Sequence, residues 1–320
     1  MKAWLAVGAV LAVAIGAVAA LLADPHLWER NHVAHAHPPR AIVFAPPRRE
    51  PRWARPPFAL REAPRHLPVH VAFTRPPKAG ILFDVDTGRV LWQRHAGRRL
   101  PIASLTKMMT ALIVAHRDDP SARVQIDRHV LAYEGSAMGV LKRGERVSVR
   151  DLFYGLLLVS GNDAAIALAE HDAGSVPAFV ARMNRWVHRL GLRCSHFSTP
   201  SGILDRDNYS CPRDLAALAR ADLAAARIAR VVRSREVRFP FPVKGGYLDL
   251  YNNNPFIYER MPGVNGLKTG YTEAAGRCYV TTQRSGGHEL GVVLLNTPNP
   301  LDQVPALLHQ GARIEARGSP

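Results

Sequence analysis

The stretch Ser104-Leu105-Thr106-Lys107, continued by an apolar run to His116, decides how this chain folds. Residues 105–116 are apolar nearly all round, which is typical of a helix buried on every side. Ser104 then lies at the N-terminal end of a central helix, where the helix dipole favours developing negative charge. Lys107 follows three residues later, so both side chains fall on one face of that helix.

This spacing predicts a serine nucleophile with a lysine as its base. A serine hydroxyl is a weak nucleophile at its free pKa and needs an adjacent base. Lys107 can be that base only if its pKa is lowered, and burial in a central helix would lower it. The alternative interpretation is a helix-capping Ser104 followed by a solvated Lys107.

Two further segments, Ser160-Gly161-Asn162 and Lys268-Thr269-Gly270, follow in this order. They would add a hydroxyl, an amide and a fixed ammonium. On composition alone, the three motifs occur together in roughly one such chain in 700. Only six of the 42 basic residues are Lys, and two of the six lie in these motifs. Because Arg is always protonated and cannot serve as a base, this usage indicates specific ammonium chemistry.

The composition indicates a globular protein with an unusual N-terminus. The chain has 320 residues, of which 47% are hydrophobic and 21% charged, enough for one substantial core. Residues 3–23 are uncharged and apolar, which predicts a signal peptide or an N-terminal membrane anchor, with a possible cleavage site at Ala17-Val18-Ala19. Residues 24–77 are rich in Pro, Arg and His and predict a disordered linker. The catalytic domain is expected at residues 78–316.

The formal net charge of +16 suggests an anionic partner. Nucleic acid is disfavoured, because no zinc-finger, basic-zipper or RNA-binding motif is present. For an exported protein the natural anions are membrane lipids and cell-wall polymers, although the many arginines are also explained by compositional bias. His32, His35 and His37 cluster in the linker, where we interpret them as solvated residues and not as a metal site.

The chain has three cysteines, an odd number for an oxidising compartment. Cys194 and Cys211 flank a loop containing Pro, Gly and Asp, and we expect a disulfide to close it. Cys278 is expected to be a buried strand residue. None of the three has the spacing of a metal site.

The remaining pattern predicts strands, a helical block, more strands and a closing helix. Helices are expected at residues 151–159, 163–171, 177–190, 212–224 and 303–316. Strands are expected at residues 81–85, 89–93, 237–239, 247–251, 266–272, 278–284 and 289–295. Ser160-Gly161-Asn162 then lies on an interhelical loop, and Lys268-Thr269-Gly270 on a strand, where Gly270 permits close approach of a ligand.

These residues resemble the D-alanyl-D-alanine carboxypeptidases, the low-molecular-mass penicillin-binding serine peptidases, over about residues 78–299. The sequence around the motifs also resembles that of the family. Leu100-Pro101-Ile102-Ala103 leads into the nucleophile motif, Gly135-Ser136-Ala137-Met138-Gly139 precedes the second motif, and Pro262-Gly263-Val264-Asn265-Gly266 leads into the third. The resemblance implies an α/β fold of the α+β type, the penicillin-recognising fold, with an antiparallel sheet flanked by helices and a helical subdomain.

The resemblance also implies a role for each motif residue. Ser104 would be the nucleophile and Lys107 its base, while Ser160 and Asn162 would relay protons and hold the substrate amide. The third motif would bind substrate, with the terminal carboxylate on Lys268 and Thr269 and close approach at Gly270. The backbone amides of Ser104 and Tyr271 would form the oxyanion hole. No metal and no cofactor are implied.

The function implied is removal of the terminal D-Ala from peptidoglycan stem pentapeptides, with β-lactam antibiotics as covalent inhibitors. Such an enzyme would act outside the cytoplasm, secreted or held at the bacterial membrane by its N-terminus, because the chain ends soon after the core. Whether water or an amine takes the acyl group is left open.

Two other functions were weighed. A secreted β-lactamase of class A needs a glutamate with an asparagine four residues on, and none of Glu170, Glu236 and Glu259 has one. Asp249 does precede Asn253 at that spacing, but on a probable strand. A cell-wall-binding protein without turnover would have no need of three intact motifs.

Overall fold

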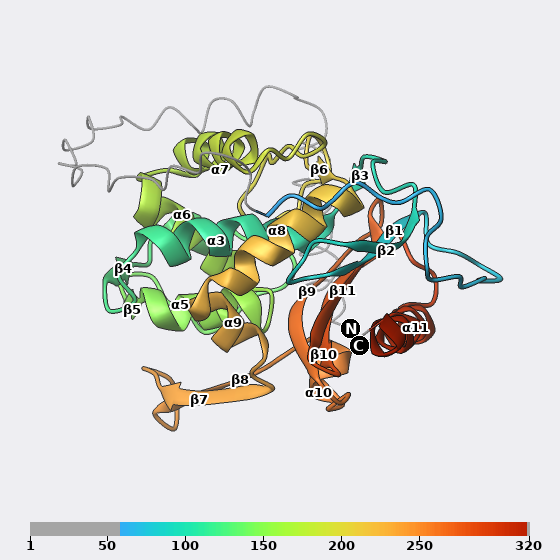
Figure 1. The fold of residues 1–320 in the computed structure, drawn as a ribbon. Helices are drawn as coiled ribbons and strands as arrows, with labels where there is room; N and C mark the ends of the chain where they lie inside the picture. The colour runs from blue at the N-terminus through green and yellow to red at the C-terminus, as the bar shows by residue number, and fades with distance from the viewer. Residues whose placement is uncertain (1–57, 319–320) are drawn as a thin grey trace, which may run out of the picture. The chain divides into compact units, whose positions relative to one another are not determined.

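A five-stranded antiparallel sheet forms one half of the folded chain and a block of helices forms the other (Figure 1). The structure is a computed structural model and describes residues 58–318. The sheet has the order β2-β1-β11-β10-β9. Its strands are β1 Ala79–Asp84, β2 Val90–Arg94, β9 Val264–Thr272, β10 Gly276–Ser285 and β11 His288–Leu295. The fold class expected from the sequence is confirmed.

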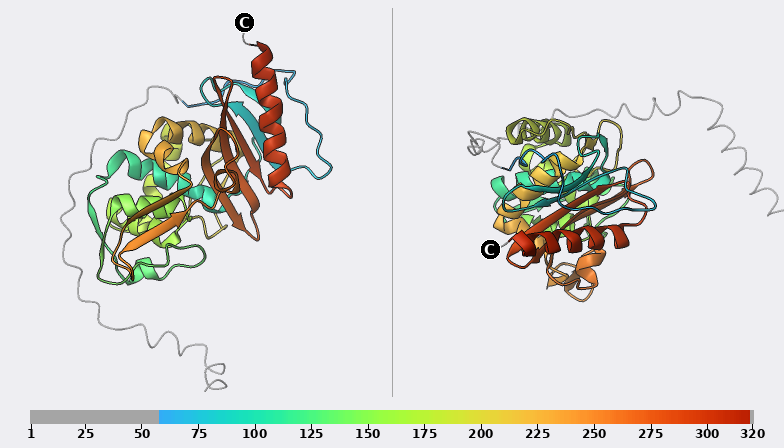
Figure 2. Two further views of the ribbon diagram at one scale, coloured as in Figure 1. Left: turned by 90° about the horizontal axis from the view of Figure 1, so that it is seen from below. Right: turned by 45° about the vertical axis from the view of Figure 1, so that its right-hand side comes forward.

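The two faces of the sheet bury different residues, as the period of two along a strand requires. Leu82 and Val292 pack with Val304 and Leu308 of helix α11 Pro300–Gly318. Alternating residues of the same strands face the helical block and join the main core. Figure 2 shows α11 lying along the outer face of the sheet, with the helical block on the other side.

Helix α3 Lys107–Arg117 is the centre of the helical block. Every residue from Lys107 to Val114 is buried, as the all-round apolar pattern predicts. The helices that contact it are α5 Val149–Leu157, α6 Asn162–Ala173, α7 Val176–Leu190, α8 Pro212–Ala224 and α9 Ala226–Val232. The expected ends of α5, α6, α7 and α8 are confirmed to within a few residues, whereas α9 was not expected from the sequence. Ser148, for example, caps α5 by accepting a hydrogen bond from the N–H of Asp151 at 3.0 Å.

The short elements escaped the sequence analysis, because two to four residues give no periodic signal. They are the 3-10 turn η1 Ala103–Thr106, strands β3 Leu100–Pro101, β4 Arg123–Gln125, β5 Arg146–Ser148 and β6 Tyr209–Ser210, and helices α4 Arg128–Leu131 and α10 Pro255–Tyr258. Strands β7 Glu236–Pro240 and β8 Tyr247–Tyr251 were expected, but they form a separate hairpin below the helices in Figure 1.

The folded domain begins earlier than expected, because residues 58–77 pack against it. Val69 is 2% exposed and its N–H donates to the carbonyl of Leu91 at 3.2 Å. Phe58 and Leu60 contact the main core, and Phe73 contacts the core under α11. These apolar residues are isolated among prolines and charges, so their sequence has no periodicity from which packing could be read.

Three expectations lie outside the described residues: the apolar segment 3–23, the linker before residue 58 and the cluster of His32, His35 and His37. Within residues 58–318, no helix has the length and apolar character needed to cross a membrane.

Candidate active site

Ser104 lies where the sheet and the helical block meet. It belongs to η1, and α3 follows directly with Lys107 as its first residue. Strand β9 passes so close that a Cβ added at Gly270 would lie 2.9 Å from the backbone nitrogen of Ser104. Only glycine allows this approach, which brings the third motif beside the first.

The ammonium nitrogen of Lys107 has three partners. Nζ lies 3.0 Å from Ser104 Oγ, 2.6 Å from Asn162 Oδ1 and 2.7 Å from the carbonyl oxygen of Ser201. The amide and carbonyl oxygens can only accept hydrogen bonds, whereas the serine hydroxyl can also donate. A neutral amine has two N–H donors and one lone pair. In that form the two donors match Asn162 and Ser201, which leaves the lone pair for the proton of the Ser104 hydroxyl.

The surroundings of Lys107 favour this neutral form. Lys107 is 0% exposed, and burial lowers its pKa well below the ordinary value, with a further contribution from the nearby charge of Lys268. Asp163 acts in the opposite direction but is the smallest of the three causes. Burial of a lysine beside a second cation is the arrangement that the sequence analysis required of a base.

The second motif joins α5 to α6. Ser160 has a φ of 61°, a left-handed conformation that is uncommon for a residue other than glycine and is concentrated at functional sites. Its Oγ is buried and has no hydrogen-bond partner among the described residues. Asn162 begins α6, where its Oδ1 contacts Lys107 and its Nδ2 donates to the carbonyl of Glu134. An unpartnered buried hydroxyl beside the groove can bond a ligand at little cost.

Asp163 fixes the loop that covers the second motif. Its carboxylate is 0% exposed and accepts hydrogen bonds from the N–H groups of Met138 at 3.0 Å and Gly139 at 3.2 Å. The N–H of Asn162 donates to the carbonyl of Ser136 in the same loop at 2.7 Å. The loop is thereby tied to the start of α6, and Ser136 is placed in the groove.

The third motif forms the opposite side of the site. Lys268 is 1% exposed, burial lowers its pKa to about 7, and its Nζ donates to the carbonyl of Thr269 at 2.8 Å. Thr269 donates from Oγ1 to Asn253 Oδ1 at 3.2 Å. Tyr271 is 67% exposed. Thr269 thus lies on the solvent side of the strand, and the side chain of Lys268 is buried behind it.

A groove of about 310 Å³ runs between these two sides. We call the side of Ser104, Lys107, Ser160 and Asn162 the helical wall, and the side of residues 268–271 on β9 the sheet wall. The residues that line the groove are Ser104, Ser136, Ser160, Asn253, Thr269, Gly270, Tyr271, Arg277 and Tyr279. Lys107, Asn162 and Lys268 lie behind this surface.

Sequence reasoning missed four of the lining residues: Ser136, Asn253, Arg277 and Tyr279. Arg277 pairs with Tyr271 across β10 and β9, and its Nη1 donates to the carbonyl of Pro298 at 3.2 Å. Ser136 lies in the segment 135–139 before the second motif, where nothing in the local sequence indicates a role in the groove. The strand alternation of β10 could have placed Arg277 and Tyr279 on one face, but no local signal indicated that this face borders the groove.

Cys194 and Cys211 are joined by a disulfide, with Cα atoms 5.8 Å apart. The loop that they close supports the helical wall, because it contains Ser201, whose carbonyl accepts from Lys107. Cys278 is a free thiol on β10, and burial raises its pKa to about 12. It is therefore an unreactive core residue.

Among residues 58–318, no glutamate lines the groove, and Glu170, Glu236 and Glu259 are not among its lining residues. Asp249, the one acid with an asparagine at the right spacing, points away on β8 and pairs with Arg238 at 2.7 Å. Asn253 does line the groove, where it contacts Thr269.

Comparison with known proteins agrees with this geometry. Residues 72–299 match the peptidase S11 family, described as D-alanyl-D-alanine carboxypeptidase. The chain belongs to this family. Among curated relatives, D-alanyl-D-alanine carboxypeptidase DacF of Bacillus subtilis is 32% identical over 231 residues, which are 71% of this chain and 59% of the relative. The chain thus spans less than two thirds of that relative's length.

Solved structures of the family superpose well on this chain. The D-alanyl-D-alanine carboxypeptidase from Mycobacterium tuberculosis H37Rv has a TM-score of 0.72 at 32% identity, covering 78% of this chain and 96% of the other. The Streptomyces K15 DD-transpeptidase has a TM-score of 0.70 at 30% identity, covering 76% and 99%. One relative is thus named as a hydrolase and the other as a transferase.

Proposed function

We propose that this chain is a serine-type D-Ala-D-Ala carboxypeptidase that acylates on Ser104 and removes the terminal D-Ala from peptidoglycan stem pentapeptides. The observation that carries the proposal is the set of three contacts at Lys107 Nζ, two to acceptors and one to the hydroxyl of Ser104. Together with the lowered pKa of Lys107, that arrangement suits proton abstraction from Ser104.

In the acylation step, the lone pair of Lys107 takes the proton of Ser104 while Oγ attacks the carbonyl carbon of the scissile amide. The oxyanion forms between the backbone N–H groups of Ser104 and Tyr271, which lie on opposite walls of the groove. A donor of this kind is worth about 3 to 4 kcal/mol in the transition state. The packing of η1 against β9 supports a pair of donors formed before substrate binds.

Collapse of the intermediate breaks the carbon–nitrogen bond and needs a proton on the leaving nitrogen. We assign Ser160 as the relay: its hydroxyl gives its proton to the leaving nitrogen and takes in return the proton that Lys107 removed from Ser104. The hydroxyl is buried, its residue lines the groove, and it has no partner of its own among the described residues. D-Ala then leaves as the free amino acid, and Ser104 keeps the acyl group as an ester.

The terminal carboxylate of the substrate belongs on the sheet wall. Thr269 Oγ1 and the guanidinium of Arg277 line the groove there, and Lys268 adds positive charge from beneath. A bound carboxylate favours the protonated form of Lys268, whose pKa lies near 7 in the free protein. Binding of the substrate carboxylate therefore stabilises the positive charge on Lys268 with which it interacts.

Deacylation by water gives carboxypeptidase activity, and capture by an amine gives transpeptidation. We favour water, in keeping with the relatives named as carboxypeptidases. Penicillin would acylate Ser104 in the same way and stay bound for longer. Its leaving group remains attached, and no lining glutamate is present to drive hydrolysis past it.

We further propose that residues 3–23 export the chain, so that it acts on the wall side of the cytoplasmic membrane. The support is the uncharged apolar segment itself and the polymeric substrate, which lies outside the cytoplasm. Either a cleaved signal peptide or a retained anchor is compatible with the proposal, and residues 24–57 would form the linker.

The direct test is incubation of the purified protein with a defined pentapeptide ending in D-Ala-D-Ala, followed by assay of free D-Ala. We expect stoichiometric release of one D-Ala per peptide, and none with Ser104→Ala. Lack of release by a folded wild-type protein that still binds the peptide would favour the non-catalytic cell-wall-binding alternative.

A further inference from the structure

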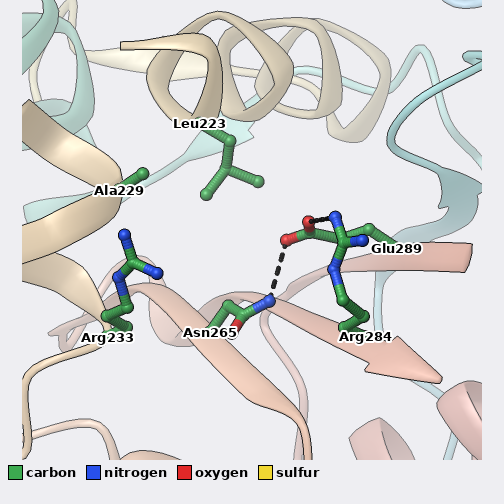
Figure 3. Close-up of a pocket in the computed structure, with 6 residues that line it drawn as sticks. All are labelled: Leu223, Ala229, Arg233, Asn265, Arg284 and Glu289. Carbon is green, nitrogen blue, oxygen red and sulfur yellow. Dashed lines mark hydrogen bonds and ion pairs between the residues drawn. The ribbon is translucent and has the colours of Figure 1, made fainter. Parts of the chain in front are cut away.

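A second cavity, of about 330 Å³, lies between the ends of α8 and α9 and the edge of the sheet (Figure 3). Its lining residues are Leu223, Ala229, Arg233, Asn265, Arg284 and Glu289. None of them lines the catalytic groove. Asn265 is the second residue of β9, three residues before Lys268, so the cavity is separate from the groove but shares a strand with it.

One side of the cavity carries a fixed negative charge. Glu289 is 9% exposed, and its carboxylate accepts from Asn265 Nδ2 and from Arg284 Nη2, each at 3.1 Å. Figure 3 shows Asn265 below the carboxylate, at the floor of the cavity, and Arg284 on the side away from the open space. Each carboxylate oxygen keeps a second lone pair, so Glu289 is held in position and can still accept from a cation in the cavity.

The opposite side carries a positive charge with nothing to neutralise it. Arg233 follows α9 and reaches the cavity from across the gap in Figure 3. Within residues 58–318 its guanidinium has no hydrogen bond, ion pair or ring contact. A guanidinium in this state presents a planar fork that matches a carboxylate bidentately.

The third feature of the cavity is its apolar cover. Leu223 points down into the space from the end of α8, and Ala229 faces it from α9 (Figure 3). A ligand here therefore meets a cation on one side, an anion on the other and a small apolar surface above. A simple anion would pair with Arg233 but leave the remaining lone pairs of Glu289 unused, and a simple cation would be repelled by Arg233 and Arg284.

We propose that this cavity binds the zwitterion of a small α-amino acid. The carboxylate pairs with Arg233, the ammonium with Glu289, and a short aliphatic side chain lies under Leu223 and Ala229. Binding of a zwitterion leaves the net charge of the cavity unchanged and satisfies both poles. The proposal does not depend on catalysis at Ser104, and its test needs no turnover.

The test measures thermal unfolding and calorimetric binding of the full chain with L-alanine, an enantiomer that differs from the D-Ala expected to leave the catalytic groove. Propionate and ethylamine are the matched ligands, each with one of the two charged groups of alanine. We expect saturable stabilisation by L-alanine, as a ligand of the native state must give, and at least about tenfold weaker binding of both matched ligands.

Arg233→Gln should weaken L-alanine binding at least about tenfold. Arg230→Gln, at an exposed residue of α9 outside the cavity, should leave it unchanged. Because Arg233 is exposed and unpaired, the variant should fold normally. The proposal is overturned if wild-type protein shows no saturable binding, if propionate binds as tightly as alanine, or if Arg233→Gln binds alanine like the wild type.

Discussion

The two walls of the catalytic groove bury a lysine each, but they use it differently. On the helical wall, Lys107 has three polar partners within 3.0 Å, and two of them can only accept. On the sheet wall, Lys268 has one carbonyl partner, that of its neighbour Thr269. Burial lowers the pKa of both.

The difference teaches that burial alone does not make a lysine a base. A lowered pKa supplies the neutral amine, but the partners decide where its lone pair points. Lys107 has its donors occupied and its lone pair directed at a hydroxyl, whereas Lys268 keeps donors free for a carboxylate. The helical wall is therefore the proton-transfer side, and the sheet wall the binding side.

A substitution of Lys107 should separate the two walls most clearly and have the largest effect on activity. Lys107→Arg replaces the neutral amine with a guanidinium, which is not deprotonated in proteins and therefore cannot act as the base. We expect the acylation rate by peptide or penicillin to fall by about 10²- to 10⁴-fold, the range for loss of general base catalysis. Lys142→Arg, at an exposed lysine, is the matched control. Acylation of Lys107→Arg at the wild-type rate would show that the base is a different group.

Lys268→Arg sharpens the comparison, because the sheet wall needs charge and not a base. We expect a loss of about tenfold in kcat/KM, mostly in KM. The pH profile is the better readout. With a pKa of about 7, Lys268 loses its charge as pH rises through neutrality, so wild-type kcat/KM should fall there. Arginine stays protonated, so the variant should lose this fall. An unchanged profile would remove Lys268 from carboxylate binding.

The disulfide should affect the helical wall only, because its loop carries Ser201. The cysteines are 17 residues apart, and closing such a loop is worth about 3 kcal/mol of stability in the chain-entropy estimate. The double variant Cys194→Ser, Cys211→Ser should lower the free energy of unfolding by about this amount. It should slow acylation slightly and leave the KM for the peptide substrate unchanged, because the sheet wall binds the substrate's carboxylate. Non-reducing peptide mapping of exported wild-type protein should find the pair linked. Free thiols at both Cys194 and Cys211 in the exported protein would refute the disulfide.

The smallest expected effect on activity is at Asp222, which lies in neither wall. It is fully buried on α8, its oxygens have no partner among the described residues, and burial raises its pKa well above the ordinary value. The neutral form suits the fold, so its contribution to stability is present at low pH and is lost as pH rises from about 3.9 towards the folded pKa.

Asp222→Asn cannot ionise and should be more stable than the wild type at neutral pH, by about 1 kcal/mol or more, with the difference shrinking towards pH 4. Acylation should be unchanged. Urea unfolding across the pH range is the measurement. A variant less stable than the wild type at every pH would mean that Asp222 is charged and paired in the native protein.

Local patterns made much of the molecule predictable. The apolar run after Ser104 gave the central helix, Ser148 gave the cap of α5, and alternating β-branched residues gave the strands of the main sheet. The motif residues were found because each lies in a short segment with its neighbours.

The rest depends on tertiary contacts that no local pattern encodes. Asn253 enters the groove because its N–H bonds the carbonyl of Leu158 at 2.9 Å, nearly a hundred positions away along the chain. Arg277 reaches it only through the pairing of β10 with β9. In residues 58–77, single apolar residues such as Val69 pack against the core, separated by residues that do not. The segment therefore has no hydrophobic periodicity, and its sequence predicts a linker.

The central claim is that Ser104 is acylated with Lys107 as its base and is deacylated slowly when the leaving group stays attached. Intact-mass spectrometry of the full chain with benzylpenicillin over time tests it most directly. We predict one penicilloyl adduct per chain, mapped to Ser104, persisting for minutes or longer and absent in Ser104→Ala. Rapid loss of the adduct with catalytic consumption of penicillin, and no release of D-Ala from peptide, would contradict the account and indicate a β-lactamase.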